Sequence, residues 1–374
     1  MTAPLQLQTA DPRAAYQAAA DEILAAIRRV LDSGQYILGP EVEAFEREFA
    51  KYLGAAHVVS VASGTDALEL ALRAAGIKPG DRVVTVAHTA TATVAAIELA
   101  GAKAVFVDVD PQSLTMDPAA LEACLVRAGD AKPTAVVPVH LYGHPADLPR
   151  IGAIAAAHGL AVIEDCAQAH GATIGGRRVG ALGVAAAFSF YPTKNLGAIG
   201  DGGAVATSDP RLAEQVRRLR QYGWRQRYVS EAPGKNSRLD ELQAAILRVK
   251  LARLDTDNQR RRTLAAEYLR RLADAGLELP TVPAEGQCVW HQFVVRTPAR
   301  EALRTHLAGA GIQTAVLYPV PIHRQPAYRD DGLHLPVTEQ ACRELLCLPM
   351  HPGLGLADVE LVCRHVLEWC AGRC

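Results

Sequence analysis

Three short segments of the sequence carry residues that could act together in one reaction. Ser63-Gly64-Thr65 follows an apolar run and precedes a helical pattern, so its backbone amides are expected at a helix N-terminus, where anions bind. A second apolar run ends in Asp165, whose carboxylate there could bind a metal, act as a base or hold a cationic ring nitrogen. Lys194 lies in a glycine-rich loop after a third run. A lysine at such a sheet edge can be desolvated, which lowers its pKa from ~10.4 and makes it an amine nucleophile.

Each of these segments also has a simpler explanation. Ser63 can cap a helix that binds no ligand, Asp165 can cap the segment that follows it, and lone lysines are usually solvated. Together, however, an anion site, an acid at a strand end and a loop lysine are the three parts that pyridoxal phosphate needs. They supply a phosphate site, a partner for the pyridine nitrogen and an amine for the Schiff base. The combination predicts an enzyme that uses this cofactor.

Motifs for other cofactors and for metals are missing or incomplete. No G-x-G-x-x-G follows the first apolar run, and no Walker A lysine is present, which argues against nicotinamide and nucleotide triphosphate binding. His140 and His144 are four residues apart, but Gly143 and Pro145 interrupt the helix that would place both on one face. Cys166 follows an apolar run and is expected to be a buried, inert thiol. We expect no metal site.

The elements that must position these residues follow an α/β pattern. Short apolar runs bounded by glycine and proline alternate with helical patterns, which is typical of a mostly parallel sheet covered on both faces. The seven predicted strands are His57–Ala62, Arg82–Ala87, Ala104–Val109, Ala135–His140, Leu160–Glu164, Ala185–Phe190 and Gly203–Thr207. The helical stretches between them include Asp66–Ala75, Thr93–Ala100, Pro118–Arg127 and Leu148–His158.

Further helices and strands are predicted before and after the sheet in the sequence. Two helices precede it, Arg13–Leu31 and Pro40–Leu53, the second of which starts at a proline and stops at a glycine. After it we expect helices at Leu239–Arg253, Asp255–Ala275, Ala299–Ala310 and Ala357–Cys370, and strands at Cys288–Val295 and near Gln313–Leu317. The pattern predicts a large cofactor-binding domain over residues 1–250 and a small α+β domain over residues 251–374. The arginines at 260–262 are expected on a solvated helix face.

Composition excludes several classes of function. The 374 residues carry 39 basic and 40 acidic side chains, a net charge of −1, which argues against a nucleic-acid partner. No apolar run approaches the ~20 residues of a membrane span, and the N-terminus has no signal-peptide pattern. The eight cysteines form no C-x-x-C pair and are expected to be reduced thiols of a cytoplasmic protein.

Longer motifs give the chain a resemblance to a known family. They are Gly39-Pro40-Glu41-Val42 with Phe45-Glu46, Ser63 to Leu68, Glu164 to Gln168, Ser189 to Asn195, and Asn236 to Ala245. In these motifs, which are spread over nearly the whole chain, it resembles the DegT/DnrJ/EryC1/StrS family of fold-type I aminotransferases, which act on nucleotide-linked keto-sugars. The resemblance implies a large domain with a seven-stranded, mostly parallel sheet and a smaller C-terminal α+β domain.

The resemblance also implies roles at matching positions. Lys194 would hold the cofactor and move a proton between it and the sugar, Asp165 would pair with the pyridine nitrogen, and Gln168 would bond the ring hydroxyl. The phosphate would be bound by Gly64, Thr65 and Ser189. Asn236 would reach the phosphate of the neighbouring subunit, which implies a homodimer with shared active sites.

The resemblance also implies which residues contact the substrate. The stretch from Leu317 to Gln325 resembles the loop of members that aminate C-3 of a dTDP-linked 3-keto-6-deoxy sugar. It makes Tyr318 and His323 candidate contacts to the sugar or its diphosphate, and Tyr191 is expected to line the substrate side. The alternative for Tyr318 is a packing role. Members commonly place an aromatic residue over the cofactor ring where this chain has Ala90. His88 is a candidate for that role, and the alternative is that it is a structural histidine.

The sequence therefore predicts a pyridoxal 5'-phosphate-dependent aminotransferase with pyridoxamine 5'-phosphate as its intermediate form. It would move an amino group from glutamate to a nucleotide-linked keto-6-deoxysugar, at C-3. The alternatives are a C-4 aminotransferase of the same family, a sugar dehydratase on the same fold, and a non-catalytic regulatory homologue. Related dehydratases replace the lysine by histidine, so Lys194 argues against the second, and intact Asp165 and Gln168 argue against the third.

Overall fold

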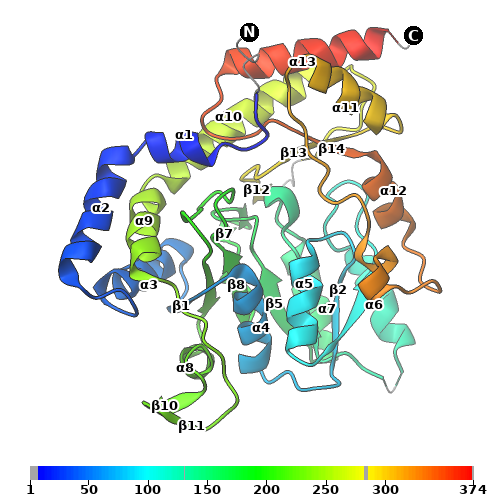
Figure 1. The fold of residues 1–374 in the computed structure, drawn as a ribbon. Coiled ribbons are helices and arrows are strands. Elements are labelled where there is room, and N and C mark those ends of the chain that lie inside the picture. The colour runs from blue at the N-terminus through cyan, green and yellow to red at the C-terminus, as the bar shows by residue number, and fades with distance from the viewer. Residues whose placement is uncertain (1–6, 130, 282–284, 373–374) are drawn as a thin grey trace.

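The computed structural model describes residues 7–129, 131–281 and 285–372 (Figure 1). All seven predicted strands are present in one sheet, whose order is β1-β9-β8-β5-β4-β2-β3. Its strands are β1 (His57–Val61), β2 (Arg82–Val86), β3 (Lys103–Val107), β4 (Ala135–Val136), β5 (Ala161–Asp165), β8 (Ala185–Ser189) and β9 (Gly203–Thr207). In this sheet β9 pairs antiparallel with β1 and β8, and the remaining pairs are parallel. The predicted mostly parallel α/β fold is confirmed.

Helices cover both faces of this sheet. They are α3 (Pro40–Leu53), α4 (Gly64–Ala74), α5 (Thr91–Leu99), α6 (Pro118–Arg127), α7 (Leu148–His158), α8 (Pro210–Leu219) and α9 (Glu241–Leu251). Because successive side chains of a strand point to opposite faces, Val83 packs with α4, α5 and α8, whereas Val84 packs with α6 and α7. Phe45 and Phe49 of α3 cover the end of the sheet formed by β1, β9 and β8.

The strand directions bring the predicted site residues to one edge. Since β9 is antiparallel to both β1 and β8, these two run in the same direction as β5, and the carboxyl ends of all three point the same way. Open α/β sheets bind ligands at that edge. The turn into α4, the end of β5 and the loop after β8 therefore meet there.

The C-terminal part has its own apolar core. Its elements are α10 (Leu254–Leu272), α11 (Arg300–Gly309), α12 (Pro336–Glu344), α13 (Leu356–Ala371), β13 (Phe293–Arg296) and β14 (Leu345–Leu348). Tyr268 of α10 stacks on Phe293 of β13 with ring centroids 4.6 Å apart. Figure 1 shows α10, α11 and α13 together above the large sheet.

Two strand predictions in this part were wrong in extent or place. The run predicted at Cys288–Val295 is extended only from Phe293, because Trp290 has a positive φ of 48° that interrupts it. The strand predicted near Gln313–Leu317 is absent: β14 pairs with β13 instead, and Ala315 forms a single bridge to Cys347 of β14.

The N-terminal helix also differs from its prediction. The stretch Arg13–Leu31 is divided into α1 (Pro12–Gln17) and α2 (Ala20–Ser33), because Ala19 leaves the helical region with a φ of −142°. The second helix lies alongside α9 (Figure 1), where Ile23 contacts Ile246.

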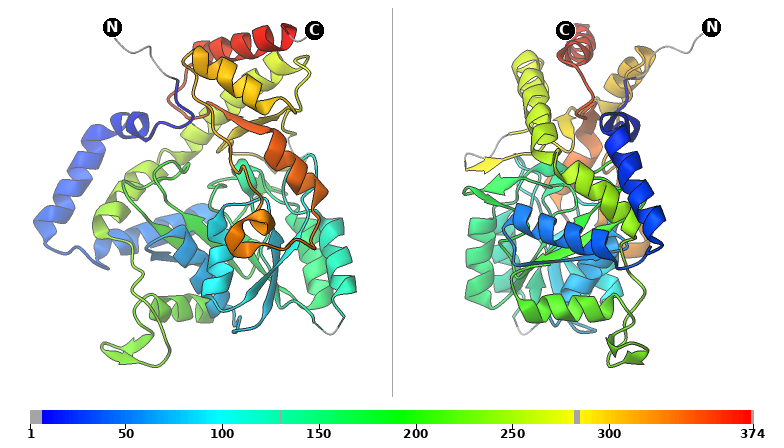
Figure 2. Two further views of the ribbon diagram at one scale, coloured as in Figure 1. Left: turned by 45° about the vertical axis from the view of Figure 1, so that its right-hand side comes forward. Right: turned by 90° about the vertical axis from the view of Figure 1, so that its left-hand side faces the viewer.

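Short strands complete the described part of the chain. One small sheet contains β6 (Thr173–Ile174), β7 (Arg177–Arg178) and β12 (Gly286–Gln287), and one hairpin pairs β10 (Trp224–Gln226) with β11 (Val229–Ser230). The hairpin projects from the body of the molecule in each view of Figures 1 and 2. Every helix among the described residues is too short or too polar to span a bilayer.

Candidate active site

One cavity at the carboxyl edge of the sheet collects most of the predicted site residues. It has a volume of about 260 Å³. Seven of the predicted residues line it: Gly64, Thr65, Asp165, Gln168, Ser189, Tyr191 and Lys194. They come from the start of α4, the end of β5 with the turn after it, and the end of β8 with its loop. Segments up to 130 residues apart in the sequence thus form one site.

Lys194 lies in the loop that follows β8, where its amide donates to the carbonyl of Tyr191 at 2.8 Å. Burial lowers the pKa of Lys194 from its ordinary value to about 8, and the negative charge of Asp165 partly opposes this shift. A substantial fraction of this lysine is therefore a neutral amine near physiological pH, which is the form that can attack a carbonyl carbon.

Asp165 ends β5 and is held by two donors. Its Oδ2 accepts a hydrogen bond from the Thr93 hydroxyl at 2.8 Å, and its Oδ1 accepts one from the Ala167 amide at 3.1 Å. The Thr93 hydroxyl also lies 2.8 Å from that of Thr89. These contacts fix the carboxylate at the cavity wall. The sequence prediction missed Thr93, although a threonine in the first turn of a mostly apolar helix was a visible signal.

The turn that the sequence predicts to bind an anion lies at the start of α4. Ser63 caps the helix through a hydrogen bond from the Asp66 amide at 3.1 Å, so the capping explanation is correct for this residue. Gly64 approaches β8 so closely that an added Cβ would lie 2.5 Å from Cβ of Ser189. The turn needs glycine here, because a side chain would push it away from the hydroxyl of Ser189.

Gln168 connects the cavity to two tyrosines. Its Oε1 accepts from the amide of Tyr142 at 2.7 Å, and its Nε2 donates to the hydroxyl of Tyr318 at 3.1 Å. Burial raises the pKa of Tyr318 to about 12, and the nearby charge of Asp165 adds to that shift. The structure therefore brings Tyr318 to the edge of the site.

His323 and Asn236 do not line this cavity. His323 is fully buried, and its Nε2 lies 3.0 Å from Oε1 of Glu339, which also accepts from Arg324 at 2.9 Å. This contact holds the loop in place. Asn236 is exposed, on a segment fixed by a 2.7 Å hydrogen bond from Ser237 to Asp66. Its reach to a neighbouring subunit stays a prediction.

The position over the cofactor ring is not filled by His88. Ala90 lines the cavity, whereas the His88 ring points to other partners. Its Nε2 lies 2.9 Å from the Tyr142 hydroxyl and its Nδ1 lies 3.4 Å from Sγ of Cys342. Burial lowers the pKa of His88 to about 4, so the ring is neutral. His88 is thus part of the packing beneath Tyr142.

Glu164, the neighbour of Asp165, is a structural residue. It is fully buried, and its carboxylate accepts from three backbone amides, those of Gly180, Leu182 and Gly183, at 2.7 to 2.8 Å. His140 Nε2 lies 3.2 Å from the same carboxylate. Both oxygens of the Glu164 carboxylate therefore already have hydrogen-bond partners. Burial raises the pKa of the nearby Cys166 thiol well above its usual range. These three side chains are close together but fit a buried hydrogen-bond cluster.

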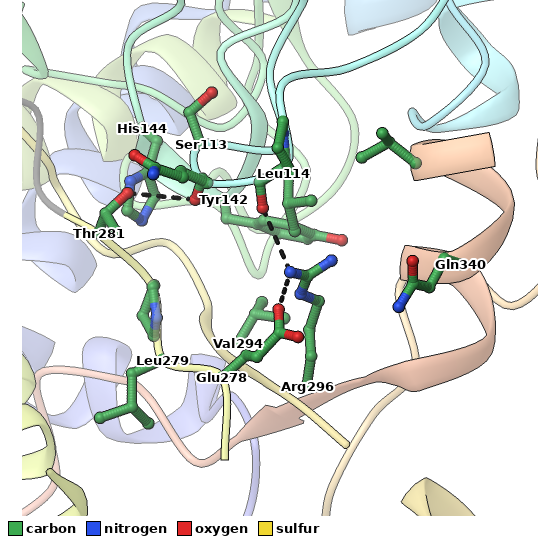
Figure 3. A pocket seen from close by; sticks show the side chains of 14 residues that line it. Ser113, Leu114, Tyr142, His144, Glu278, Leu279, Thr281, Val294, Arg296 and Gln340 are labelled. Carbon is green, nitrogen blue, oxygen red and sulfur yellow. Dashed lines mark hydrogen bonds and ion pairs between the residues drawn. The ribbon is translucent and has the colours of Figure 1, made fainter. Parts of the chain in front are cut away.

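A larger cavity, of about 510 Å³, lies between the large sheet and the C-terminal part. Figure 3 shows Arg296 and Glu278 pointing toward one another in it, near Tyr142 and His144. Arg296 also donates to the carbonyl of Pro111 at 3.3 Å. The charges of Arg296 and Glu278 thus neutralise each other. None of the predicted catalytic residues lines this larger cavity.

Comparisons with known proteins agree with this geometry. The chain is 50% identical over 363 residues to the dTDP-3-amino-3,4,6-trideoxy-alpha-D-glucose transaminase of Streptomyces venezuelae, which covers 96% of this chain and 95% of that protein. A solved structure of S. venezuelae DesV, in complex with a ketimine intermediate, superposes with a TM-score of 0.94 at 49% identity and covers 98% of each chain.

A more distant solved structure carries a cofactor. NtdA of Bacillus subtilis, with bound cofactor PMP, has a TM-score of 0.85 at 32% identity and covers 94% of this chain and 82% of its own. These neighbours confirm the predicted fold-type I architecture. The model of the DegT/DnrJ/EryC1/StrS aminotransferase family matches residues 17–367. The chain belongs to the DegT/DnrJ/EryC1/StrS aminotransferase family.

Proposed function

We propose that this protein is a pyridoxal-phosphate-dependent aminotransferase that moves an amino group from glutamate to C-3 of a dTDP-linked keto-6-deoxysugar. The observation that carries the proposal is the meeting of Lys194, Asp165 and the Gly64 turn in one cavity. The C-3 position is supported by the name of the S. venezuelae relative, a dTDP-3-amino-sugar transaminase.

The residues of the cavity fit the cofactor. The start of α4, with the hydroxyls of Thr65 and Ser189, suits a phosphate because helix N-termini favour anions and Gly64 lets the backbone come close. Asp165 suits a protonated pyridine nitrogen, and Gln168 suits the ring oxygen. When bound, pyridoxal phosphate supplies an electron sink for negative charge at the reacting carbon.

Lys194 is the proposed catalytic residue. Its neutral amine would hold the cofactor covalently, and as a free amine Lys194 would accept and return a proton at Nζ. A pKa of about 8 suits both tasks, because the amine alternates between its neutral and charged forms close to the working pH. The Asp165 carboxyl group would face the ring in one orientation, because Thr93 and Ala167 fix its two oxygens.

The proposal also covers the oligomeric state of the protein and its location in the cell. A homodimer with shared sites is supported by the exposure of Asn236, on a segment that one chain holds outside its own cavity. A cytoplasmic location suits six of the described cysteines, which form no disulfide: Cys124, Cys166, Cys288, Cys342, Cys347 and Cys363. We also propose that the chain has a large domain over residues 1–250 and a small domain over residues 251–374.

The test is a panel of nucleotide keto-sugars incubated with glutamate and the purified protein. NMR of the product identifies the aminated carbon, and we expect C-3 of a dTDP-linked sugar. Borohydride treatment should fix the cofactor to Lys194, and Lys194→Ala should abolish turnover. A protein that stays colourless when pyridoxal phosphate is added, or unchanged turnover in Lys194→Ala, would overturn the enzyme assignment. Amination at C-4 would overturn the position alone.

A further inference from the structure

Two histidines and a glutamate lie together where α11 packs against α13. His306 is in the last turn of α11, and His365 is in α13. The centroids of their rings are 6.0 Å apart, and the ring planes meet at 60°. Glu368 follows one turn later in α13, where its Oε2 lies 3.1 Å from Nδ1 of His365. We call these three side chains the two-helix cluster.

The side chains of the two-helix cluster are close enough to share one ion. Each offers one ligand atom, an imidazole nitrogen or a carboxylate oxygen, and these atoms all lie within 4.8 Å of one another. Two ligand atoms that are each about 2.1 Å from a tetrahedral zinc ion are about 3.4 Å apart. His365 and Glu368 already have nearly that spacing. A small rotation of the partly exposed His306 side chain closes the remaining gap.

The two helices hold these ligands at the rim of a packed interface. Leu307 of α11 and Val366 of α13 belong to one apolar core, and both are fully buried. His306 directly precedes Leu307, and His365 directly precedes Val366, so both imidazoles lie beside this core. His365 and Glu368 are three positions apart and therefore share one face of α13. The fold thus fixes the backbone positions of all three ligands.

Simpler explanations account for single residues of the two-helix cluster but not for the group. A histidine in the last turn of a helix interacts favourably with the helix dipole, which suits His306 alone. An exposed pair such as His365 with Glu368 contributes little to stability. Neither explanation accounts for two imidazoles, which repel each other when both are charged, beside one carboxylate. Coordination of a single ion accounts for all three side chains.

One other group of this kind occurs among the described residues, and its atoms already have partners. It consists of the buried side chains of His140, Glu164 and Cys166. Both oxygens of Glu164 accept from backbone amides, and Nδ1 of His140 accepts from a backbone amide at 2.9 Å. In the described part of the chain, the two-helix cluster has no hydrogen bond or ion pair beyond that between His365 and Glu368. Its ligand atoms are therefore the ones available to an ion.

We propose that the two-helix cluster binds one divalent transition-metal ion, with zinc as the first choice. Two imidazoles and a carboxylate are ligands that zinc commonly takes. The Glu368 side chain is 54% exposed, so the ion enters from solvent and water takes the fourth position. Because the ligands come from two helices, the bound ion ties α11 to α13 and stabilises the C-terminal part. None of the three side chains lines the cavity at Asp165, so the proposal is independent of aminotransfer.

This proposal replaces the sequence expectation that the chain has no metal site. His306 and His365 are about sixty residues apart, so no local spacing motif joins them. Only the packing of α11 against α13 brings the two rings together.

The experiment measures zinc binding to the cofactor-loaded protein, which is free of any histidine tag, fully reduced and treated with a chelator that is then removed. We expect calorimetry to show a site in which His306→Gln and His365→Gln each raise the Kd of zinc at least about tenfold, or 1.4 kcal/mol. His158→Gln is the matched control, because His158 also lies in the last turn of a helix, is exposed, and belongs to neither group. Glu368→Gln replaces either variant if it does not fold.

Two further measurements identify the ligands and the place of binding. Cobalt substitutes for zinc, and thiolate ligands give it an intense charge-transfer band that imidazole and carboxylate ligands do not. We expect the first equivalent of cobalt to show no such band. Zinc should also slow the hydrogen exchange of amides in α11 and α13 of the wild type and of His158→Gln, but not of His365→Gln. Zinc binding that does not saturate or is equal in all variants, a thiolate band, or unchanged exchange in both helices would overturn the proposal.

Discussion

The hydroxyl of Thr93 donates a 2.8 Å hydrogen bond to Oδ2 of Asp165, which joins the first turn of α5 to the last residue of β5. Both side chains are buried. The bond leaves the carboxylate with one orientation relative to the cavity, because the Ala167 amide holds the other oxygen. Thr93 is therefore a positioning residue for the proposed partner of the cofactor nitrogen.

Thr93→Val should weaken catalysis while keeping the fold. A hydrogen bond to a charged group contributes about 1.5–3 kcal/mol, so we expect kcat to fall roughly ten- to a hundredfold. Valine fills nearly the same volume, and the cofactor should still bind with altered absorbance. Thr85→Val is the control, since the Thr85 hydroxyl is equally buried and donates to the Val137 carbonyl at 2.9 Å, away from the site. Equal kcat values for the two variants would contradict the role of Thr93.

Gly64→Ala should impair cofactor binding. The new Cβ would lie 2.5 Å from Cβ of Ser189, so the turn and the end of β8 have to separate. We expect the Kd for pyridoxal phosphate, measured by fluorescence titration, to rise at least about tenfold, or 1.4 kcal/mol. Gly152→Ala in α7 is the matched control, because nothing lies within 4 Å of its added Cβ. That change should raise the thermal midpoint slightly, since alanine favours helix.

The pH dependence of cofactor attachment should report the state of Lys194. Burial lowers its pKa to about 8, so the amine is mostly protonated and unreactive below that pH and mostly neutral above it. The rate of attachment to the cofactor-free protein should therefore rise with pH and level off above about 8. Borohydride trapping followed by mass spectrometry measures this rate at Lys194 and, for comparison, at the exposed Lys103. A rate at Lys194 that keeps rising to pH 10 would contradict the shift.

Local patterns were sufficient for the large sheet and for the centre of the site. The run before Asp165 and the loop around Lys194 are each contiguous, and parallel strands bring their ends to a common edge without further information. Helices α6 and α7 begin and end where the sequence predicts, because proline opens their first turns and aspartate caps them.

Features that depend on contacts between distant segments were not predictable in the same way. In the sequence, nothing distinguishes Arg261 from its neighbours Arg260 and Arg262. Only the packing of α10 against the C-terminal part shows that Arg261 faces inward. The pairing of β13 with β14 joins residues about fifty apart, and His323 is buried by Glu339 from α12. The domain boundary at residue 250 and the role of Asn236 stay predictions.

The shared active site can be tested by mixing two inactive variants. If Asn236 of one subunit completes the site that contains Lys194 of the other, a hybrid of Lys194→Ala and Asn236→Ala chains has one site with both residues intact. Random exchange makes about half of the dimers hybrid, so activity should recover to about a quarter of the wild-type value. Each variant alone should show far less.

The segment that carries Asn236 gives this experiment its control. Lys235 pairs with Asp66 and Glu69 of its own chain, and Ser237 bonds Asp66, so the segment keeps its place when the asparagine is removed. Mixing Lys194→Ala with Asp165→Asn should restore nothing, because both residues line the same cavity of one chain and no hybrid site has the pair intact. No recovery in the first mixture would show that Asn236 does not complete the site of the other subunit. Recovery in the second mixture would show that Lys194 and Asp165 of one chain do not act in the same site.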